Sequence, residues 1–186
     1  MAIEDVVKDA HDRMGKSVEA LRRELAIIRT GRASPRLLDS IQVNYYGTLT
    51  PLNQLATITV PEARVLLIQV WDRGAATDVE RAILASDLGL TPNSDGEVIR
   101  ITLPVLTEER RRELVKVVAR KSEDGHVAVR NIRRASIEGL RKLEKDGEIG
   151  QDEGRRAQDQ VQKITDSYIG EMDGLRKDKE SEVLEV

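Results

Sequence analysis

The chain has 186 residues, of which 34 % are charged, and it contains no Cys and no Phe. Because Cys is absent and only two His occur, the sequence excludes disulfides, thiolate nucleophiles and zinc sites of the usual ligand type. We therefore expect no metal centre and no cofactor. The formal net charge of −3 would by itself argue against a nucleic-acid partner.

The N-terminal segment carries acidic and basic residues within its first nine positions and has no apolar run, so we expect no signal peptide. No stretch of the sequence approaches the eighteen apolar residues that a membrane span requires. The sequence accordingly predicts a cytoplasmic protein with no membrane partner.

Residues 3 to 30 show the repeat of an amphipathic helix. The apolar residues that follow each other at steps of three and four are Ile3, Val7, Ala10, Met14, Val18, Leu21, Leu25 and Ile28. This spacing places them on one face of a helix. Gly31 is expected to end that helix.

The pattern changes to strands and turns between residues 31 and 105. The expected elements are a hairpin over 41–51 with its turn at Gly47, strands over 55–60 and 65–71, a helix over 77–88 ended by Gly89, a turn over 93–96 and a strand over 98–103. Together they predict a small sheet with one helix.

Three aromatic residues in this segment carry separate expectations. Trp71 ends a predicted strand and is expected to be a packing residue. Tyr45 and Tyr46 are neighbours on a strand, so one should point inward and the other outward. An exposed tyrosine there would favour a surface for a partner.

The helical repeat resumes after residue 107 in two long segments. The apolar positions are Leu114, Val118, Ile132, Ala135, Leu140 and Leu143 in the first, and Ala157, Val161, Ile164, Tyr168, Met172 and Leu175 in the second. Three helices of this kind, each about 40 to 60 Å long, predict an elongated bundle. Since each apolar face is satisfied inside the bundle, we expect a monomer.

The order of these patterns indicates that one domain is inserted into another. The fold class is α+β, with a three-helix bundle over residues 1–30 and 105–186 and a small β/α domain over 31–104, between the first and second helices. At 186 residues the length allows two domains, and the change of periodicity favours two.

Charge is distributed unevenly along the chain. Residues 1–30, 31–105, 106–145 and 146–186 carry net charges of 0, −2, +5 and −6. The middle helix is basic. Five of its cations lie within about 40° of one another around the helix axis, namely Arg112, Lys116, Arg130, Arg134 and Arg141. The commoner interpretation of such a face is that it is merely solvated, and the alternative is that it binds a polyanion.

Arg111 and Arg133 favour the second interpretation. Their helical angles place them toward the edge of the apolar face, where a purely solvating Arg gains little. A guanidinium can hold phosphate with two hydrogen bonds, which suits an RNA backbone. Because no aromatic residues are interleaved with the cations, any contact would read shape and phosphate rather than sequence.

Both crossings between the expected domains contain helix-breaking residues. The candidate hinge consists of Thr30, Gly31, Arg32, Ala33, Ser34 and Pro35 in the first crossing, and of Leu103, Pro104, Val105 and Leu106 in the second. Gly31 permits unusual dihedral angles, while Pro35 and Pro104 interrupt regular structure. A rigid elbow fixed by packing of Leu103 and Leu106 is the alternative.

Eight short motifs give the chain a resemblance to a known family. They are IRTGRASP at 28–35, YYG at 45–47, PLNQLA at 51–56, SDLGL at 86–90, LTEERRREL at 106–114, VRNIRR at 129–134, KITD at 163–166 and KESEV at 179–183. In this order and over nearly the whole chain, they resemble bacterial ribosome recycling factor.

This resemblance implies an L-shaped protein without a catalytic site, which binds the ribosome after termination. Members of the family act with elongation factor G and GTP to split the ribosome into subunits, so that ribosome, messenger RNA and deacylated transfer RNA are recycled. GTP hydrolysis belongs to that partner, to which the small domain is presented.

The resemblance also implies roles for individual residues in binding large-subunit ribosomal RNA. The matching arginines are Arg111, Arg130 and Arg133, with Arg112 and Arg134 as neighbours on the same face. Arg32 and Asn131 are expected to support the same tip or hinge. The chain departs from the family pattern mildly, at Gly150 and Gln151 before the third helix and at Gly125 inside the second.

Two other classes of function compete with this interpretation. A helical adaptor would bind a protein partner through the bundle, insensitive to RNase and only weakly dependent on salt. An enzyme is disfavoured because the acidic residues of the last helix have no His or Cys companions. The sequence also has no Gly-rich phosphate loop, so we expect no small-molecule substrate and no GTP bound by the chain itself.

Overall fold

Contacts divide the chain into two units in the computed structural model, which describes residues 2–185. The bundle unit contains residues 2–29 and 108–185, and the small unit contains residues 30–107. The outermost residues of the expected bundle, Met1 and Val186, lie outside the described residues. The expected α+β class, with β structure inserted after the first helix, is confirmed.

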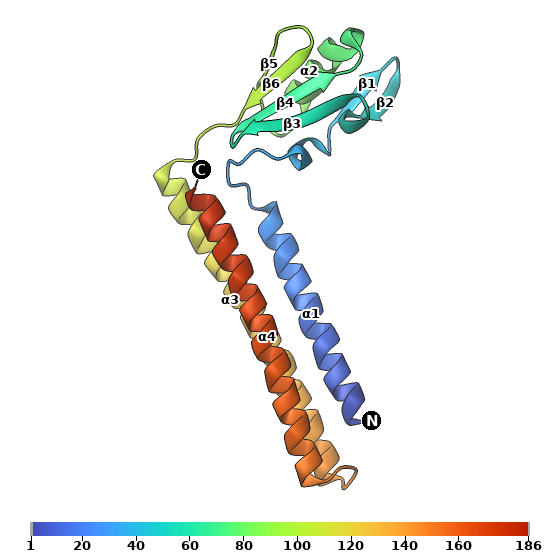
Figure 1. Cartoon of the computed structure of the whole chain (residues 1–186), viewed down its shortest axis with the longest axis vertical. Helices are drawn as coiled ribbons and strands as arrows, with labels where there is room; N and C mark the ends of the chain where they lie inside the picture. Colours follow the sequence, from blue (N-terminus) through green and yellow to red (C-terminus); the bar gives the residue numbers. More distant parts are fainter. Residues whose placement is uncertain (1, 186) are drawn as a thin grey trace. The chain divides into compact units, whose positions relative to one another are not determined.

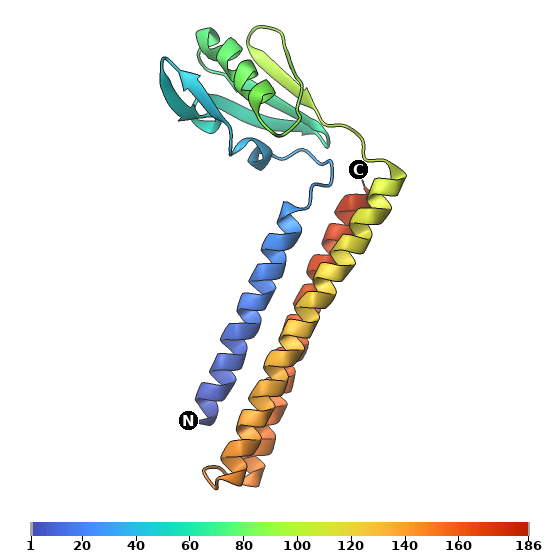
Figure 2. The same ribbon diagram turned by 180° about the vertical axis from the view of Figure 1, so that it is seen from behind.

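Three long helices form the bundle unit, namely α1 (Ile3–Ile27), α3 (Glu108–Lys145) and α4 (Gln151–Leu184). They lie side by side, with α1 and α4 running in one direction and α3 in the other (Figures 1 and 2). At 1.5 Å per residue, the 38 residues of α3 span about 57 Å. None of the helices within residues 2–185 has the length and apolar character needed to cross a membrane.

The bundle core is aliphatic and is filled by the stripes that the sequence predicts, with small shifts in register. On α1 the stripe begins with Val6, while Val7 is only half-buried. On α3 the sequence predicts Ala135 in the core, but Ala135 is exposed and the next residue, Ser136, is buried instead. Ser136 can occupy the core because its hydroxyl donates to the Ile132 carbonyl oxygen at 2.9 Å, which satisfies the donor within the helix.

Gly125 lies inside α3 without interrupting the helix. A Cβ atom at this position would lie 3.2 Å from Met172 Sδ and 3.5 Å from Leu21 Cδ2. The glycine therefore allows α1 and α4 to approach α3 closely at one level of the bundle, which offsets its low helix propensity.

The helix ends differ in detail from the sequence-based expectation. Helix α1 ends at Ile27, before Gly31, because Ile28 already has extended backbone angles. At the start of α4, the Gly150 N–H donates to the Glu153 carboxylate at 2.9 Å. A carboxylate in the first turn satisfies an otherwise free donor and interacts favourably with the helix dipole.

The small unit contains two antiparallel sheets and one α-helix, α2 (Ala76–Ala85). Its strands are β1 (Gln42–Tyr45), β2 (Thr48–Pro51), β3 (Ala56–Glu62), β4 (Val65–Val70), β5 (Pro92–Ser94) and β6 (Val98–Thr102). Strands β1 and β2 form the expected hairpin, and the other four form a sheet of order β3-β4-β6-β5. Short 3₁₀ turns precede β1, β3 and α2.

Helix α2 covers one face of the four-stranded sheet (Figure 2). On β4 the residues Leu66, Ile68 and Val70 alternate toward a core shared with Val79 and Ile83 of α2. Apolar alternation with period two is the pattern of a strand that buries one face. The small unit thus has its own hydrophobic core.

Three expectations for the small unit are wrong. Helix α2 ends at Ala85 rather than at Leu88, because the Ser86 hydroxyl donates to the Ile83 carbonyl at 2.6 Å and the backbone turns extended there. Asn93 and Ser94 belong to strand β5 rather than to a turn. Trp71 is 64 % exposed, and instead of packing inward it donates from Nε1 to Thr57 Oγ1 at 2.9 Å.

Candidate nucleic-acid interface

The long basic helix α3 carries most of the expected binding residues, in two places. Arg111 and Arg112 form an N-terminal pair, and Arg130, Asn131, Arg133 and Arg134 form a mid-helix group. Arg130 lies 18 positions after Arg112, which is about 27 Å along the helix. Arg32 is exposed and belongs to the small unit.

Arg133 lies where α3 packs against α4. It is half-buried, and its terminal nitrogen NH1 donates to Gln162 Oε1 at 2.7 Å. Its Nε is buried and has no hydrogen-bond partner among the described residues. The side chain therefore holds its aliphatic part within the bundle and its charged end at the surface, as expected for an arginine at the edge of the apolar face.

The N-terminal pair consists of one half-buried arginine, Arg111, and one exposed arginine, Arg112. Arg111 is half-buried, and its Nε is buried without a hydrogen-bond partner in the described part of the chain. Arg112 is exposed and pairs with the Glu108 carboxylate one turn earlier. A pair between two exposed groups contributes only about 0 to 1 kcal/mol, so Arg112 can exchange this carboxylate for another anion.

Arg130 belongs to a small network of ionisable groups. Its NH1 lies 3.2 Å from a Glu123 carboxylate oxygen, and both side chains are more than half exposed. The other Glu123 oxygen lies 3.6 Å from Nδ1 of the buried His126. His126 Nε2 is 2.9 Å from Asp173 Oδ1, but outside hydrogen-bond geometry.

The two remaining mid-helix residues are simply exposed. Arg134 and Asn131 both project from α3 into solvent. With Arg130 and the charged end of Arg133, they place three guanidinium groups and one amide within five consecutive positions. Such a group can donate to several anionic oxygens at once.

The crossings between the units are tied to the small unit at one turn. The N–H of Ala33 donates to the Ala63 carbonyl oxygen at 2.7 Å, and the N–H of Leu103 donates to the Arg64 carbonyl oxygen at 2.8 Å. Ala63 and Arg64 form the tight turn between β3 and β4. Ala33 and Leu103 are also buried in the core of the small unit.

An aromatic and acidic arrangement lies at the hairpin of the small unit. Tyr45 and Tyr46 donate from their hydroxyls to Asp72 Oδ2, at 3.0 and 3.2 Å, and the Gly74 N–H donates to Oδ1 at 2.9 Å. These hydrogen bonds, with that from Gly74 the strongest influence, lower the pKa of the Asp72 carboxyl. The bonds to Asp72 raise the pKa of both tyrosines.

Tyr46 also has unusual backbone geometry. Its φ is 48°, and that of the following Gly47 is 84°. Two consecutive residues with positive φ match the tight turns that suit the twist of a hairpin. Tyr46 is 79 % exposed whereas Tyr45 is half-buried, so the expected difference in exposure is found. The expected reason for it is wrong, because Tyr46 lies in the turn and both hydroxyls reach the same Asp72 oxygen.

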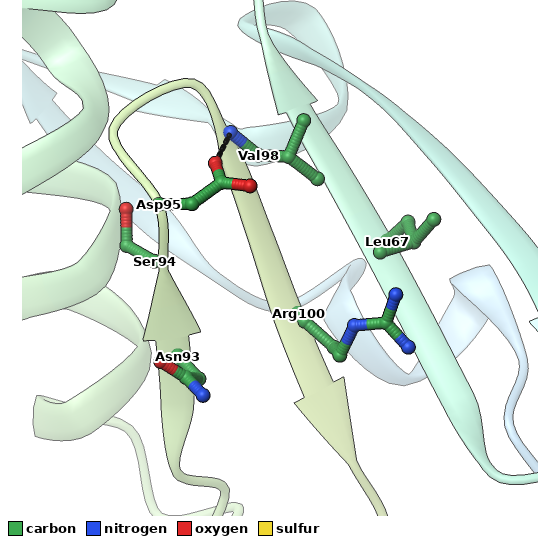
Figure 3. Close-up of a pocket in the computed structure, with 6 residues that line it drawn as sticks. All are labelled: Leu67, Asn93, Ser94, Asp95, Val98 and Arg100. Atoms are coloured by element: carbon green, nitrogen blue, oxygen red, sulfur yellow. Dashed lines mark hydrogen bonds between the residues drawn. The ribbon is translucent and has the colours of Figure 1, made fainter.

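A shallow hollow of about 240 Å³ lies on the sheet of the small unit (Figure 3). Its lining residues are Leu67, Asn93, Ser94, Asp95, Val98 and Arg100. The Asp95 carboxylate already accepts the Val98 N–H at 3.0 Å. Within residues 2–185, no group of three or more His, Cys, Asp or Glu side chains could hold a metal ion.

Sequence reasoning missed one contributor to this interface, Gln162 of α4. From the sequence, the acidic residues of the last helix, of which Asp166 is one, are considered only as catalytic candidates. Gln162 Nε2 donates to Asp166 Oδ1 at 2.8 Å while its Oε1 accepts from Arg133. A Gln and an Asp four residues apart are neighbours on a helix surface. This spacing could have indicated a hydrogen bond between the two side chains.

Comparison with known proteins agrees with this architecture. A family model described as ribosome recycling factor matches residues 21–184. A ribosome-recycling factor of Geobacillus sp. (strain WCH70) is 57 % identical over 184 residues, covering 99 % of this chain and all of the relative. One from Desulforamulus reducens is 54 % identical with the same coverage.

Two solved structures are similar over the whole chain. A solution structure of ribosome recycling factor has a TM-score of 0.75 and 45 % sequence identity, covering all of this chain and 99 % of the other. A second, of the T. thermophilus factor, has a TM-score of 0.64 and 46 % identity, covering 99 % of this chain and all of the other.

The fold and these relatives place the chain among the translation factors. The family match spans most of the sequence, and the relatives exceed 50 % identity over nearly the full length. The chain belongs to the ribosome recycling factor family.

Proposed function

We propose that this protein binds the post-termination ribosome and, with elongation factor G and GTP, splits it into subunits, so that ribosome, messenger RNA and transfer RNA are recycled. The second of the similar structures supports this proposal, because in it the T. thermophilus factor and the E. coli elongation factor G are bound to the E. coli post-termination complex. That factor and this chain are 46 % identical.

The observation that carries the proposal is the state of the arginines on α3. The half-buried Arg111 and Arg133 each hold a charged end at the surface, and neither is joined to a carboxylate by any pair found within residues 2–185. Within the described part of the chain, Arg130 pairs only with a carboxylate that is itself more than half exposed. These guanidinium groups are therefore available for phosphate oxygens of large-subunit ribosomal RNA.

The two units have separate tasks in this proposal. The bundle, residues 1–30 and 105–186, is the RNA-binding domain, and Arg111, Arg112, Arg130, Asn131, Arg133 and Arg134 contribute its contacts, with support from Arg32. The small domain, residues 31–104, is the part presented to elongation factor G. A monomer suffices for both tasks.

Bending between the units is confined to short pieces of backbone. Ala33 and Leu103 are fixed in the small unit by their hydrogen bonds and burial. This leaves residues 28–32 and 104–107, rather than the full candidate hinge, as the segments whose dihedral angles change. Gly31, with a φ of 78°, and Pro104 lie in these two segments.

The chain has no catalytic site of its own in this proposal, and GTP hydrolysis belongs to elongation factor G. The protein acts mechanically. Arginines hold the bundle on ribosomal RNA while a force applied to the small domain is transmitted to the contacts between the subunits.

Sedimentation of washed ribosomes that carry messenger and transfer RNA tests the proposal. The particles are run with and without this protein, elongation factor G and GTP. We expect intact particles to disappear only when all three are present. Splitting that proceeds equally well without this protein, or binding that resists RNase and salt, would instead favour a helical adaptor.

A further inference from the structure

Arg133 is held by a neutral group, whereas two other arginines of the interface are held by carboxylates. Arg112 and Arg130 pair with carboxylates of their own helix. Arg133 instead donates across to the amide oxygen of Gln162 on α4, at 2.7 Å. Its charge is consequently not cancelled by the group that holds it.

The amide of Gln162 has a fixed orientation. A guanidinium can only donate hydrogen bonds, and an ionised carboxylate can only accept them. Gln162 lies between one of each, with its oxygen toward Arg133 and its nitrogen 2.8 Å from Asp166 Oδ1. The two partners therefore permit one amide orientation and exclude the flipped one.

We propose that Gln162 is a positioning residue, which holds the Arg133 guanidinium in its RNA-binding orientation without neutralising it, and that Asp166 keeps the Gln162 amide turned toward Arg133. This inference rests on the proposed function, because it requires that Arg133 contact ribosomal RNA. With Nε enclosed in the bundle and one terminal N–H used by Gln162, the other terminal N–H groups remain for phosphate.

A neutral partner has a physical advantage at this position. A carboxylate would bind the guanidinium strongly and compete with the phosphate of the RNA. With no partner at all, the long side chain would have to lose rotamer freedom on binding. Immobilising such a side chain weakens affinity by about 2- to 10-fold, and Gln162 removes most of that loss in advance.

Two substitutions separate charge from orientation. Gln162→Glu keeps the shape but adds a carboxylate next to Arg133, and Gln162→Met keeps a similar length but removes the hydrogen bond. The matched control is Gln160→Glu, the same change of charge two residues away at an exposed site on another face of α4. Binding to salt-washed 70S ribosomes is measured as a function of salt.

The two variants should fail in different ways. For Gln162→Glu we expect about 10-fold weaker binding. The slope of log affinity against log salt should be flatter by about 0.7 to 0.9, which corresponds to the loss of one phosphate contact. For Gln162→Met we expect about 2- to 10-fold weaker binding with the same slope. Thermal melting should change little for Gln162→Glu, because the new ion pair with Arg133 is opposed by repulsion from the Asp166 carboxylate, to which Gln162 donates in the parent protein.

Each variant is also combined with Arg133→Ala. We expect Gln162→Met to have no further effect in that background, and Gln162→Glu to fall to the small effect of Gln160→Glu. Gln162 variants that bind normally, or that lose affinity equally with and without Arg133, would overturn the positioning role alone. If Arg133→Ala itself binds with unchanged affinity and slope, both this role and the proposed RNA contact of Arg133 are overturned.

Discussion

If the proposed function is right, replacing Arg133 with Ala should remove one charged contact to RNA while leaving the bundle folded. The side chain makes one observed hydrogen bond, to Gln162, and its Nε has no partner among residues 2–185. We therefore expect the free energy of unfolding to fall by about 1 kcal/mol for the lost hydrogen bond, with a further small loss from the packing of the aliphatic part of the side chain. Denaturant titration of both proteins measures this change.

The effect on ribosome binding should be much larger. A hydrogen bond that involves a charged group contributes about 1.5 to 3 kcal/mol, which corresponds to about a 10- to 150-fold loss of affinity. Each phosphate contact changes the slope of log affinity against log salt by about 0.7 to 0.9. The ratio of variant to parent dissociation constants should thus shrink about threefold between 50 and 200 mM salt.

Arg133→Lys distinguishes charge from geometry in the same assay. The ammonium keeps the charge but lacks the planar pair of donors that matches a phosphate. We expect the parental salt slope with affinity between those of Arg133 and Arg133→Ala. An Arg133→Ala protein that is folded and binds with parental affinity and slope would refute the assignment of this arginine to the RNA interface.

Three further outcomes follow from the geometry. Ser122 is buried in the bundle, and its hydroxyl has no hydrogen-bond partner among residues 2–185. Ser122→Ala should therefore raise the free energy of unfolding by about 1 kcal/mol, whereas Ser136→Ala, which loses a satisfied hydroxyl, should gain less in the same denaturant titration. Because the pKa of Asp72 is lowered, the ionised carboxylate stabilises the small unit above the ordinary pKa of Asp, and this stabilisation is lost as pH falls through the lowered value. The fluorescence of Trp71, the single tryptophan and the residue before Asp72, should report this loss. Asp72→Asn should remove the pH dependence. The chain has no Cys, so Leu49→Cys and Lys163→Cys, both at exposed positions of different units, accept a label pair, and we expect a broad distribution of distances in the free protein.

Opposite results would be equally informative. A Ser122→Ala protein no more stable than the Ser136→Ala protein would indicate that the buried hydroxyl is in fact satisfied. Fluorescence that changes with pH in the same way after Asp72→Asn would assign the transition to another carboxyl group. One narrow distance between the labels would favour the rigid elbow over the hinge.

The long helices were predictable because their signal repeats many times. In α1 an apolar residue recurs every three or four positions along the whole helix. In α3 and α4 the repeat is long enough to be recognised although polar residues such as Ser122, His126 and Thr165 occupy some core positions. Small errors of register arose where a polar residue replaced an apolar one. Ser136 is buried because its hydroxyl bonds within the helix, which hydrophobicity alone does not reveal.

Short elements were harder because their signal is local and weak. Strand β5 has three residues, Pro92–Ser94, whose composition is that of a turn, and pairing with β6 makes it a strand. Helix α2 stops at Ala85 because the Ser86 side chain competes for a carbonyl. Trp71 is exposed because Thr57 on the neighbouring strand supplies a partner for its indole N–H.

Some residues of the candidate interface could be proposed from the sequence, and others could not. The arginines of α3 could be proposed from the sequence because they recur on one helix and some lie at the edge of its apolar face. Gln162 could not be found with equal ease, since its importance depends on which face of α4 meets Arg133. That contact joins residues 29 positions apart and is a property of the folded bundle.

The turn formed by Ala63 and Arg64 receives the backbone of both crossings. A single two-residue loop, distant in sequence from either crossing, thus serves as the shared anchor of the small unit's entrance and exit. Lengthening that loop would release the incoming and outgoing chain together and soften the coupling between the units, although every residue of the candidate hinge would be intact. Evolution could therefore adjust the stiffness of this connection at a site that carries no hinge sequence at all.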